Sequence, residues 1–176
     1  MKKFVLLAVA MSFSMASFSQ NGMSAGIYGG IPVGDASTND SHSFAIGVDL
    51  AYMWEVSTKF RAGLSVGYHN GFGKDFSTEL LTINRSLAVD GKFVDYGVAI
   101  IGVRPEIDLS DKIELGLTVG YGVATGDGYN GGLAIQPSVG YNIKDNIQIR
   151  ASYLNVNESD LDFNWSTINF GLDFHF

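Results

Sequence analysis

Apolar and polar residues alternate through most of the chain after Gly22, with the two-residue period of a β-strand and not the 3.6-residue period of a helix. In the clearest run, one face carries Phe44, Ile46, Val48, Leu50, Tyr52, Trp54 and Val56. Five similar runs cover residues 60–68, 113–123, 133–143, 147–153 and 168–176, and two weaker ones cover 24–33 and 93–107. The pattern therefore predicts eight strands.

Two of these runs contain an irregularity. In the run 93–107, the apolar face changes from Val98 and Ile100 to Ile101 and Val103. One extra residue reverses the facing of a strand, so we expect a bulge near Ile100–Ile101. In the run 133–143, Pro137 cannot donate a ladder hydrogen bond, and this predicts a second local bulge.

The connections between the predicted strands alternate in length. Those after Val56, around Ser110 and around Asp145 are short, whereas 34–42, 70–92, 125–131 and 157–163 are long. An even number of strands, with short turns at one rim and long loops at the other, is typical of an outer-membrane barrel. A soluble β-sandwich also has alternating strands and frequent turns, so the alternation alone leaves both architectures open.

The composition of the two faces favours a barrel in lipid. The polar face is rich in Gly, Ser, Thr and Asn, and the apolar face is aliphatic with aromatic ends. If the amino terminus is periplasmic, the aromatic residues fall at two rims, as interfacial girdles require. The outer rim then has Phe44, Tyr68, Tyr121 and Tyr153, and the inner rim has Tyr52, Trp54, Phe60, Tyr141, Phe174 and Phe176. We therefore predict an all-β fold, an eight-stranded antiparallel up-and-down transmembrane β-barrel with short periplasmic turns and longer extracellular loops.

Residues 1–19 have the features of a signal peptide. Lys2 and Lys3 precede an apolar stretch from Phe4 to Phe13, and small residues at Ser17 and Ser19 place the cleavage before Gln20. The apolar stretch is short for a membrane-spanning helix, which argues against an anchor. The expected domain is therefore an exported barrel of residues 20–176.

Charge and cysteine content exclude several classes of function. The chain has 11 Lys and Arg and 18 Asp and Glu, and two of the lysines lie in the leader. A nucleic-acid-binding face needs clustered basic residues, so we expect no nucleic acid as a partner. The absence of Cys excludes disulfides, thiolate zinc sites and thiol nucleophiles. We expect no cofactor.

The carboxyl-terminal strand carries a recognisable pattern. Phe170, Leu172, Phe174 and Phe176 occupy alternate positions up to the last residue. With its leader, this chain resembles the small eight-stranded outer-membrane proteins, such as OmpX and the barrel part of outer-membrane protein A. The hairpin DLSDKIELGLTVGYGV resembles the outer membrane protein beta-barrel domain family. The resemblance implies an outer-membrane location, contact with membrane lipid and lipopolysaccharide, and a terminal signal, formed by these four residues, that the outer-membrane assembly machinery reads. We expect a monomer.

Eight strands close on an interior that side chains can fill. The charged residues predicted to face inward are Glu55, Arg61, Arg104, Glu106, Glu114, Arg150, Asp173 and His175. Buried ions need partners, so we expect pairs such as Glu55 with Arg61 and Arg104 with Glu114. We interpret the set as a structural plug, with a gate or ion path as the alternative. Inward-facing glycines predict a narrow wet cavity nearby: Gly26, Gly30, Gly47, Gly63, Gly67, Gly116, Gly120 and Gly122.

Catalytic and metal-binding patterns are weak. Some eight-stranded barrels modify lipid A, and His42, Asp75 and Ser77 are the candidates for an acyltransferase-like set. A deacylase-like site needs His and Ser two residues apart, which His69 lacks. The acidic loops around Asp35 and Asp40, 126–128 and 158–162 lack the spacing of a calcium loop. We expect no catalytic, cofactor or metal site.

The sequence therefore predicts a structural or interaction protein anchored in the outer membrane. The segment 70–92 is long and partly apolar, with Leu80, Leu81, Ile83, Leu87 and Val89. It either extends as a hairpin above the membrane and meets a surface partner, or folds onto its neighbours. The alternative function is a narrow channel for small solutes or ions.

Overall fold

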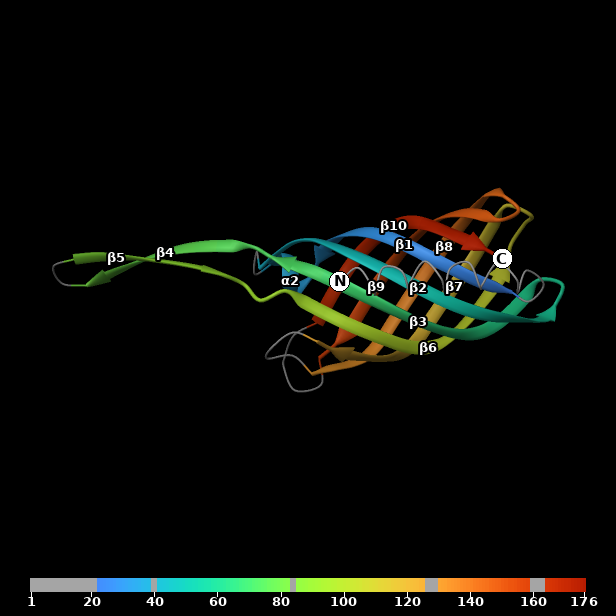
Figure 1. Ribbon diagram of the computed structural model, residues 1–176, viewed down its shortest axis with the longest axis horizontal. Helices are drawn as coiled ribbons and strands as arrows, with labels where there is room; N and C mark the ends of the chain where they lie inside the picture. Colours follow the sequence, from blue (N-terminus) through green and yellow to red (C-terminus); the bar gives the residue numbers. More distant parts are fainter. Residues whose placement is uncertain (1–21, 39–40, 83–84, 126–129, 159–163) are drawn as a thin grey trace, which may run out of the picture.

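The computed structural model describes residues 22–38, 41–82, 85–125, 130–158 and 164–176 (Figure 1). The predicted signal peptide and its cleavage site lie outside the described residues. No helix within the described ranges is long and apolar enough to cross a membrane. The elements are β1 (Met23–Val33), α2 (Asp35–Thr38), β2 (His42–Ser57), β3 (Phe60–Gly73), β4 (Asp75–Thr82), β5 (Arg85–Lys92), β6 (Tyr96–Asp108), β7 (Ile113–Ala124), β8 (Gly131–Lys144), β9 (Ile147–Asn157) and β10 (Asn164–His175).

Eight of these strands form a closed barrel in the order β1-β10-β9-β8-β7-β6-β3-β2. Each neighbouring pair is antiparallel, and the ring closes where β1 pairs with β10 from Ser24 opposite His175 to Val33 opposite Ser166. The predicted eight-stranded antiparallel barrel is confirmed. The other two strands, β4 and β5, make a separate two-stranded sheet that projects from one end of the barrel (Figure 1).

The connections separate the two ends of the barrel. The links β2–β3, β6–β7 and β8–β9 are short turns at one end, here called the turn end, where Met23 and Phe176 also lie. The chain leaves β1, β3, β7 and β9 at the other end, the loop end; α2 follows β1 there, and the β4–β5 hairpin follows β3. The interior of the barrel therefore faces short turns at one end and longer connections at the other.

The expected bulge at Ile100–Ile101 is wrong. Against β7, the register of β6 is the same at Val98, opposite Ala124, and at Glu106, opposite Gly116. The strand keeps its alternation, so Val98 and Ile100 point inward and Ile101 and Val103 point outward. The apolar residues change face because the interior near the loop end is itself apolar.

The bulge expected at Pro137 is also wrong. The β8–β9 pairs on either side, Ile135 with Asn155 and Ser138 with Ser152, have the same register. The irregularity between these strands lies at Asn142 and Lys144, beside the turn. Pro137 is therefore accommodated within a continuous strand.

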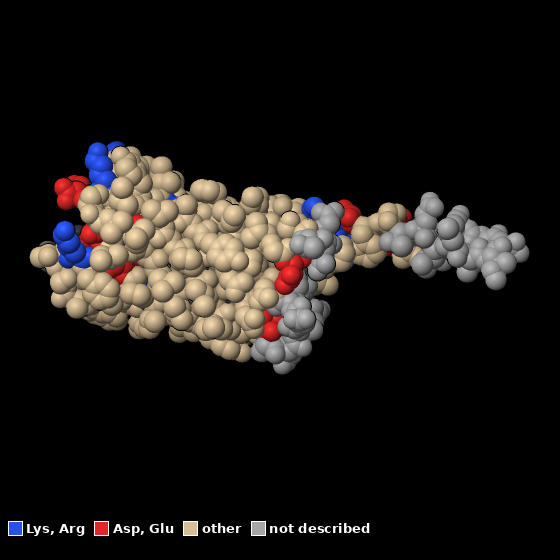
Figure 2. Space-filling model, turned by 180° about the vertical axis from the view of Figure 1, so that it is seen from behind, with Lys and Arg blue, Asp and Glu red and all other residues tan. Residues whose placement is uncertain are grey.

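The outside of the barrel is an apolar belt. On the face seen in Figure 2, charged side chains gather at the two ends of the barrel, with uncharged surface between them. Leu117 and Ile149 are exposed in this belt, and so is Phe170 midway along β10. Most other exposed aromatic side chains of the barrel lie toward the ends: Phe44, Tyr68, Tyr121 and Tyr153 at the loop end, and Trp54, Phe60, Tyr141 and Phe176 at the turn end. Tyr52 and Phe174 are half-buried. An exposed apolar belt with aromatic edges suits a hydrocarbon layer and not water.

Candidate functional site

The interior at the loop end is filled by an apolar cluster. Its members are buried side chains from five strands: Ala45, Tyr96, Val98, Ile100, Ala134, Leu154, Val156 and Trp165. The ring of Trp165 stacks on Tyr96, with ring centroids 4.7 Å apart, and meets the edge of His42 at 4.8 Å. This cluster occupies part of the interior where the sequence predicted a narrow, glycine-lined wet cavity.

The buried carboxylate of Glu158 joins three strands at the loop end by hydrogen bonds. Glu158 accepts a hydrogen bond from the Tyr96 hydroxyl at 2.6 Å. Its second oxygen accepts the backbone N–H groups of Asn130 at 2.9 Å and Gly131 at 2.7 Å. Glu158 therefore links the start of β6, the start of β8 and the end of β9 above the apolar cluster.

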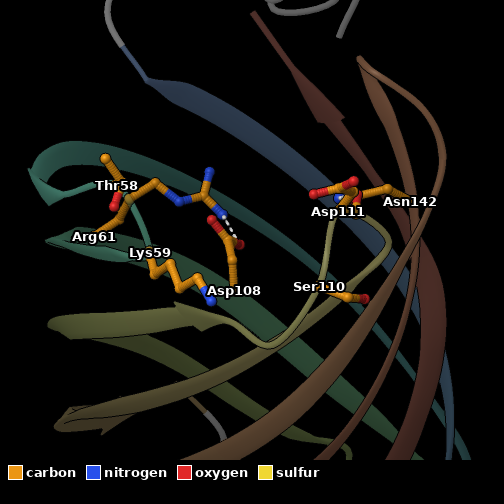
Figure 3. A pocket seen from close by; sticks show the side chains of 7 residues that line it. All are labelled: Thr58, Lys59, Arg61, Asp108, Ser110, Asp111 and Asn142. Carbon is orange, nitrogen blue, oxygen red and sulfur yellow. Dashed lines mark hydrogen bonds and ion pairs between the residues drawn. The ribbon is translucent and has the colours of Figure 1, made fainter.

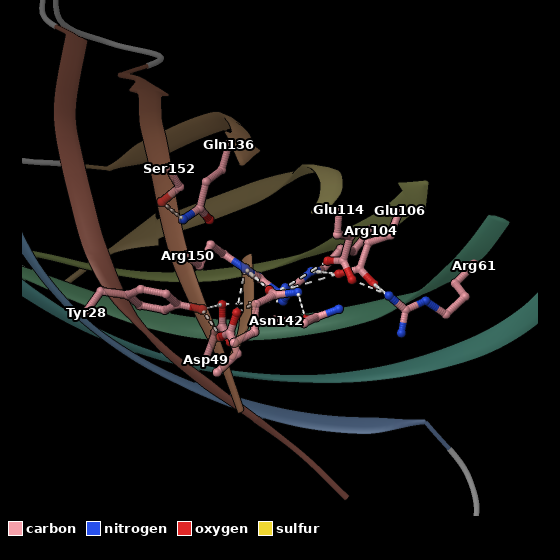
Figure 4. Close-up of polar contacts among 12 residues, drawn as sticks. Tyr28, Asp49, Arg61, Arg104, Glu106, Glu114, Gln136, Asn142, Arg150 and Ser152 are labelled. Carbon is pink, nitrogen blue, oxygen red and sulfur yellow. Dashed lines mark hydrogen bonds and ion pairs between the residues drawn. The ribbon is translucent and has the colours of Figure 1, made fainter. Parts of the chain in front are cut away.

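The half of the interior toward the turn end holds a charged cluster, defined as Asp49, Arg61, Arg104, Glu106, Glu114, Arg150 and Asp173 (Figure 4). Arg104 Nε lies 2.7 Å from Glu106 Oε1, and Arg150 Nε lies 2.5 Å from Asp173 Oδ2. Arg61 lies nearer the rim and contacts Glu106 at 3.4 Å and also Glu114. Apart from Arg61 and Asp49, these side chains are almost fully buried.

The structure brings together most of the charged residues predicted to face inward, but their ion pairs differ from the predicted ones. Glu55 stands opposite Arg61 across β2 and β3, but it is exposed beside a register shift at the open rim and is not part of the cluster. Arg61 turns inward to Glu114, and Arg104 pairs with Glu106 in place of the expected Glu114. His175 is half-buried at the turn-end mouth.

Two members of the interior were missed by sequence reasoning. Tyr28 Oη lies 2.7 Å from Asp49 Oδ2 and 2.7 Å from Asp173 Oδ1. Asp49 shares the inward face of β2 with Gly47 and Ala51, and this parity was the available signal. Tyr28 belongs to a weak run of small residues, where nothing marked it as a partner for acids.

The glycines expected to line a narrow wet cavity lie close to other groups: side chains at Gly26, Gly47 and Gly122, and backbone at Gly120. A Cβ built on Gly47 would lie 2.5 Å from the His69 ring, and one on Gly26 would lie 2.1 Å from the Tyr28 hydroxyl. A Cβ on Gly122 would lie 2.8 Å from Val98 in the apolar cluster. At these three positions an interior side chain occupies the space beside the glycine.

The charged cluster reaches solvent at the turn end. A polar cleft of about 310 Å³ is lined by Thr58, Lys59, Arg61, Asp108, Ser110, Asp111 and Asn142 (Figure 3). A second cleft of about 150 Å³ is bounded by Arg61, Glu114, His175 and Phe176, among others. Arg61 borders both clefts, so its guanidinium separates the buried ions from the aqueous mouth.

The β4–β5 hairpin stands on a short polar and aromatic base. The rings of Phe76 and Phe93 are 5.0 Å apart and both are partly exposed. Asp95 accepts the backbone N–H of Gly73 at 2.9 Å and lies 3.4 Å from Lys92 Nζ. The Gly73 hydrogen bond, helped by the Lys92 charge, lowers the pKa of Asp95. The described parts of this segment, 70–82 and 85–92, take the extended form and not the folded-back form (Figure 1).

The residues considered for catalysis are not assembled. His42 Nδ1 lies 2.8 Å from Ser41 Oγ, and its Nε2 lies 3.1 Å from the Val94 carbonyl. Ser77 donates its hydrogen bond to Asp90. Within the described residues, no group of three or more His, Asp or Glu side chains is placed to hold a metal ion. Asp40, 126–128 and 159–162, which belong to the acidic loops, lie outside the described residues.

Comparison with known proteins assigns the fold. The family model described as outer membrane protein beta-barrel domain matches residues 4–176. The chain belongs to this family. The protein is therefore an outer-membrane β-barrel, and the predicted location in the outer membrane is confirmed. No curated protein matches the chain.

Solved structures of other outer-membrane barrels are similar in fold. Ail of Yersinia pestis is 15% identical with a TM-score of 0.53, covering 89% of this chain and 97% of Ail. The N-terminal barrel of Pseudomonas aeruginosa OprF is 11% identical with a TM-score of 0.55, covering 89% and 98%. Neisserial surface protein A is 14% identical with a TM-score of 0.50, covering 88% and 96%. At these identities the likeness shows the fold alone.

Proposed function

We propose that this protein is a structural and interaction protein of the outer membrane, with a plugged barrel, no catalytic activity and a projecting surface hairpin. The observation that supports this most is the filling of the interior from both ends. The apolar cluster occupies the loop end, and the charged cluster occupies the half toward the turn end. Eight strands enclose too little space for a water channel beside such side chains.

The rival function is a narrow channel for small solutes or ions. Conduction needs a continuous wet path, and the buried rings of Tyr96 and Trp165 lie across that path at the loop end. Purified protein refolded into planar bilayers should show no stable conductance steps. A variant that combines Trp165→Ala and Leu154→Ala removes bulk from the same place and serves as the matched comparison. Stable steps from the unchanged protein contradict the proposal.

We propose that the turn end faces the periplasm and the loop end faces outward. This orientation fits the short turns and long loops of the family's architecture. Cysteines placed at Ser77 and Thr125, both exposed at the loop end, should react with a membrane-impermeant maleimide on intact cells. A cysteine at Ser57, exposed at the turn end, should react only after the outer membrane is permeabilised. The opposite labelling reverses the orientation.

We propose that the outer-membrane assembly machinery reads the carboxyl-terminal strand. Phe170 and Phe176 are exposed on the outer face of β10 and its end, where a receptor can reach them. Phe176→Ala should lower the amount of folded protein in the outer membrane and increase periplasmic degradation. Tyr141→Ala is the matched control, since it removes another exposed aromatic ring at the same end. Equal yields from both variants contradict the terminal signal.

We propose that the barrel is a monomer among outer-membrane lipid and lipopolysaccharide, and that the hairpin meets a surface partner. The closed ring has no unpaired strand edge, whereas β4 and β5 are both edges of a two-stranded sheet. Edge strands accept an extended peptide by backbone pairing, so the proposed partner contributes a β-strand. A photo-crosslinking residue at Ser77 should give one discrete protein adduct on cells, and one at Leu117 should give none. No adduct from Ser77 contradicts the partner.

A further inference from the structure

The β4–β5 hairpin continues the β3–β6 pair of the barrel wall without a change of register (Figure 1). In the wall, Gly71 lies opposite Tyr96, and in the hairpin, Asp75 lies opposite Lys92, four residues away along each strand. Neither strand has an extra residue between these two pairs. Since side chains alternate with a period of two, one face of the hairpin continues the outer surface of the barrel and the other continues its inner surface.

The two faces of the hairpin differ in polarity. The face that continues the outer surface carries Phe76 and Val89, with Phe93 at its base, and these side chains are 37%, 38% and 37% exposed. The rings of Phe76 and Phe93 are 5.0 Å apart. On the other face, the Ser77 hydroxyl donates a hydrogen bond to the Asp90 carboxylate. The base of the hairpin is therefore amphipathic, with its apolar face partly exposed.

Aromatic rings connect this apolar face to the belt of the barrel. Tyr68 belongs to the aromatic residues at the loop end of the belt, and Phe72 follows it on the same face of β3. The ring of Phe72 stacks on that of Phe44 from β2, with centroids 4.5 Å apart. The aromatic surface thus continues from the belt through Phe72 to Phe76, beyond the end of the barrel wall.

The wall on the opposite side of the ring ends in polar groups. In the strand order, β9 and β10 lie across the ring from β3 and β6. Beyond Tyr153, the outward positions of this wall hold two polar pairs. Asn155 Nδ2 donates to Ser166 Oγ at 2.8 Å, and Asn157 Nδ2 donates to Asn164 Oδ1 at 2.8 Å. The outer surface therefore becomes polar directly above the belt on one side and stays aromatic on the other.

We propose that the apolar face of the hairpin base, formed by Phe76, Val89 and Phe93, rests in the lipid headgroup layer of the membrane. This face is continuous with a belt that already contacts lipid, so the membrane surface is the occupant next to it. Asn70 and Lys74 lie in the same stretch of chain. Aromatic rings mixed with polar and basic groups are typical of the headgroup layer and not of the hydrocarbon core.

In this arrangement the hairpin leans over the lipid on the β3–β6 side of the barrel and turns its polar face to water, as an amphipathic element at a membrane surface does. The contact goes beyond the surface partner proposed above, because that partner pairs with the strand edges and this contact uses one face. It also holds for either orientation of the barrel. The two proposals can therefore fail separately.

Spin labels on the two faces test the contact. The chain has no Cys, so a single introduced cysteine defines the labelled site. Labels at Val89 and Ser77 lie on opposite faces at neighbouring register positions, and both sites are exposed. The labelled protein is refolded at low density into phosphatidylcholine vesicles. Ni²⁺ is supplied either on a chelating lipid headgroup in both leaflets or as a soluble chelate on both sides.

Electron paramagnetic resonance saturation measures how strongly each form of Ni²⁺ relaxes the label. The ratio of relaxation by lipid-bound Ni²⁺ to relaxation by soluble Ni²⁺ should be higher at Val89 than at Ser77. Equal ratios at the two sites mean that the hairpin stands in water, and they overturn the proposal. Protection of Val89 from both forms means that a second copy of the chain covers the face, and this also overturns it.

A double variant, Phe76→Ser with Phe93→Ser, tests the two rings. It should lower the ratio at Val89 to the value at Ser77, because the face loses the groups that hold it at the lipid surface. Phe60→Ser is the matched control, since it removes an exposed ring at the turn end, and it should leave the ratio unchanged. An unchanged ratio in the double variant, or an equal fall in Phe60→Ser, overturns the assignment.

Discussion

The two ends of the barrel interior are filled by different kinds of side chain on the same inward-facing positions. At the loop end, apolar groups such as Trp165 and Leu154 are buried without any charge to desolvate. Toward the turn end, Arg104, Glu106 and Asp173 are equally buried, and their charges are tolerated there only because they form ion pairs. The lumen is closed by packing at one end and by pairing at the other.

The two fillings of the interior differ in their access to water and in how they respond to mutation. The turn end opens into polar clefts, so water reaches Arg61. In the plugged barrel that we propose, the apolar cluster forms the barrier at the loop end. A truncation at the loop end leaves a void, whereas loss of one charge toward the turn end leaves its partners buried and unpaired.

The largest effect is expected from Arg104→Met in the charged cluster. It removes the guanidinium that faces Glu106, Asp49 and Asp173, and breaking a buried pair costs about 3–5 kcal/mol. Urea unfolding in lipid vesicles measures the loss. The double variant Arg104→Met with Glu106→Gln should recover part of it, because fewer carboxylates are left without a partner. A double variant no more stable than the single one argues against pairing as the source of stability.

Leu154→Ala in the apolar cluster should cost about 2–5 kcal/mol, through lost burial and a cavity. Leu117→Ala on the outer face is its control, since lipid fills the space that the shorter side chain leaves. The same unfolding measurement compares the two. An equal loss at both positions would mean that the loop-end interior is not a packed core.

Glu158→Gln separates the contribution of the Glu158 hydrogen bonds at the loop end from that of the apolar cluster beneath them. The amide keeps one acceptor oxygen but loses the charge that receives Tyr96, Asn130 and Gly131. Hydrogen bonds to charged groups contribute about 1.5–3 kcal/mol, so the loss should lie in that range. Hydrogen exchange at Gly131 should also become faster, while exchange at Gly140, near the turn end, stays unchanged. Faster exchange at both sites would show a global effect.

The smallest effect lies outside the barrel, at Asp95. Its lowered pKa means that the contacts with Gly73 and Lys92 stabilise the hairpin base above the usual aspartate pKa. This stabilisation is lost as the pH falls through the pKa of the folded state, and solvent screening keeps it small. An NMR titration of the Asp95 carboxyl should give a midpoint below the ordinary aspartate pKa. A midpoint at or above that ordinary value contradicts the contact.

Alternation predicted the strands and the outer face of the barrel because both depend only on a two-residue period. The faces of Leu117 and Ile149 followed directly from it. The error at Ile100–Ile101 came from treating every apolar residue as facing lipid, although Val98 and Ile100 belong to an apolar interior. A period gives the facing of a side chain but not the polarity of the space that it faces.

The partners inside the barrel could not be predicted for a different reason. Arg61 stands opposite Glu55 in the register, yet its long side chain contacts Glu114 on β7, the strand on the far side of β6. Such contacts depend on the tilt and stagger of the strands around the ring and on rotamers. The inward-facing glycines followed from the alternation, but the rings that cover them did not: Tyr28 covers Gly26 on its own strand, and His69 on β3 covers Gly47 on β2.

The pairing of β1 with β10 has a consequence for how the barrel forms. It joins the first and last barrel strands, so these contacts have nearly the largest sequence separation available in the chain. Contacts of large separation require the most chain entropy to be lost, and they form late. Before this step both strands have an open edge, and lipid cannot satisfy the backbone groups on it. Insertion and ring closure are therefore expected to occur together, after the last strand has been delivered.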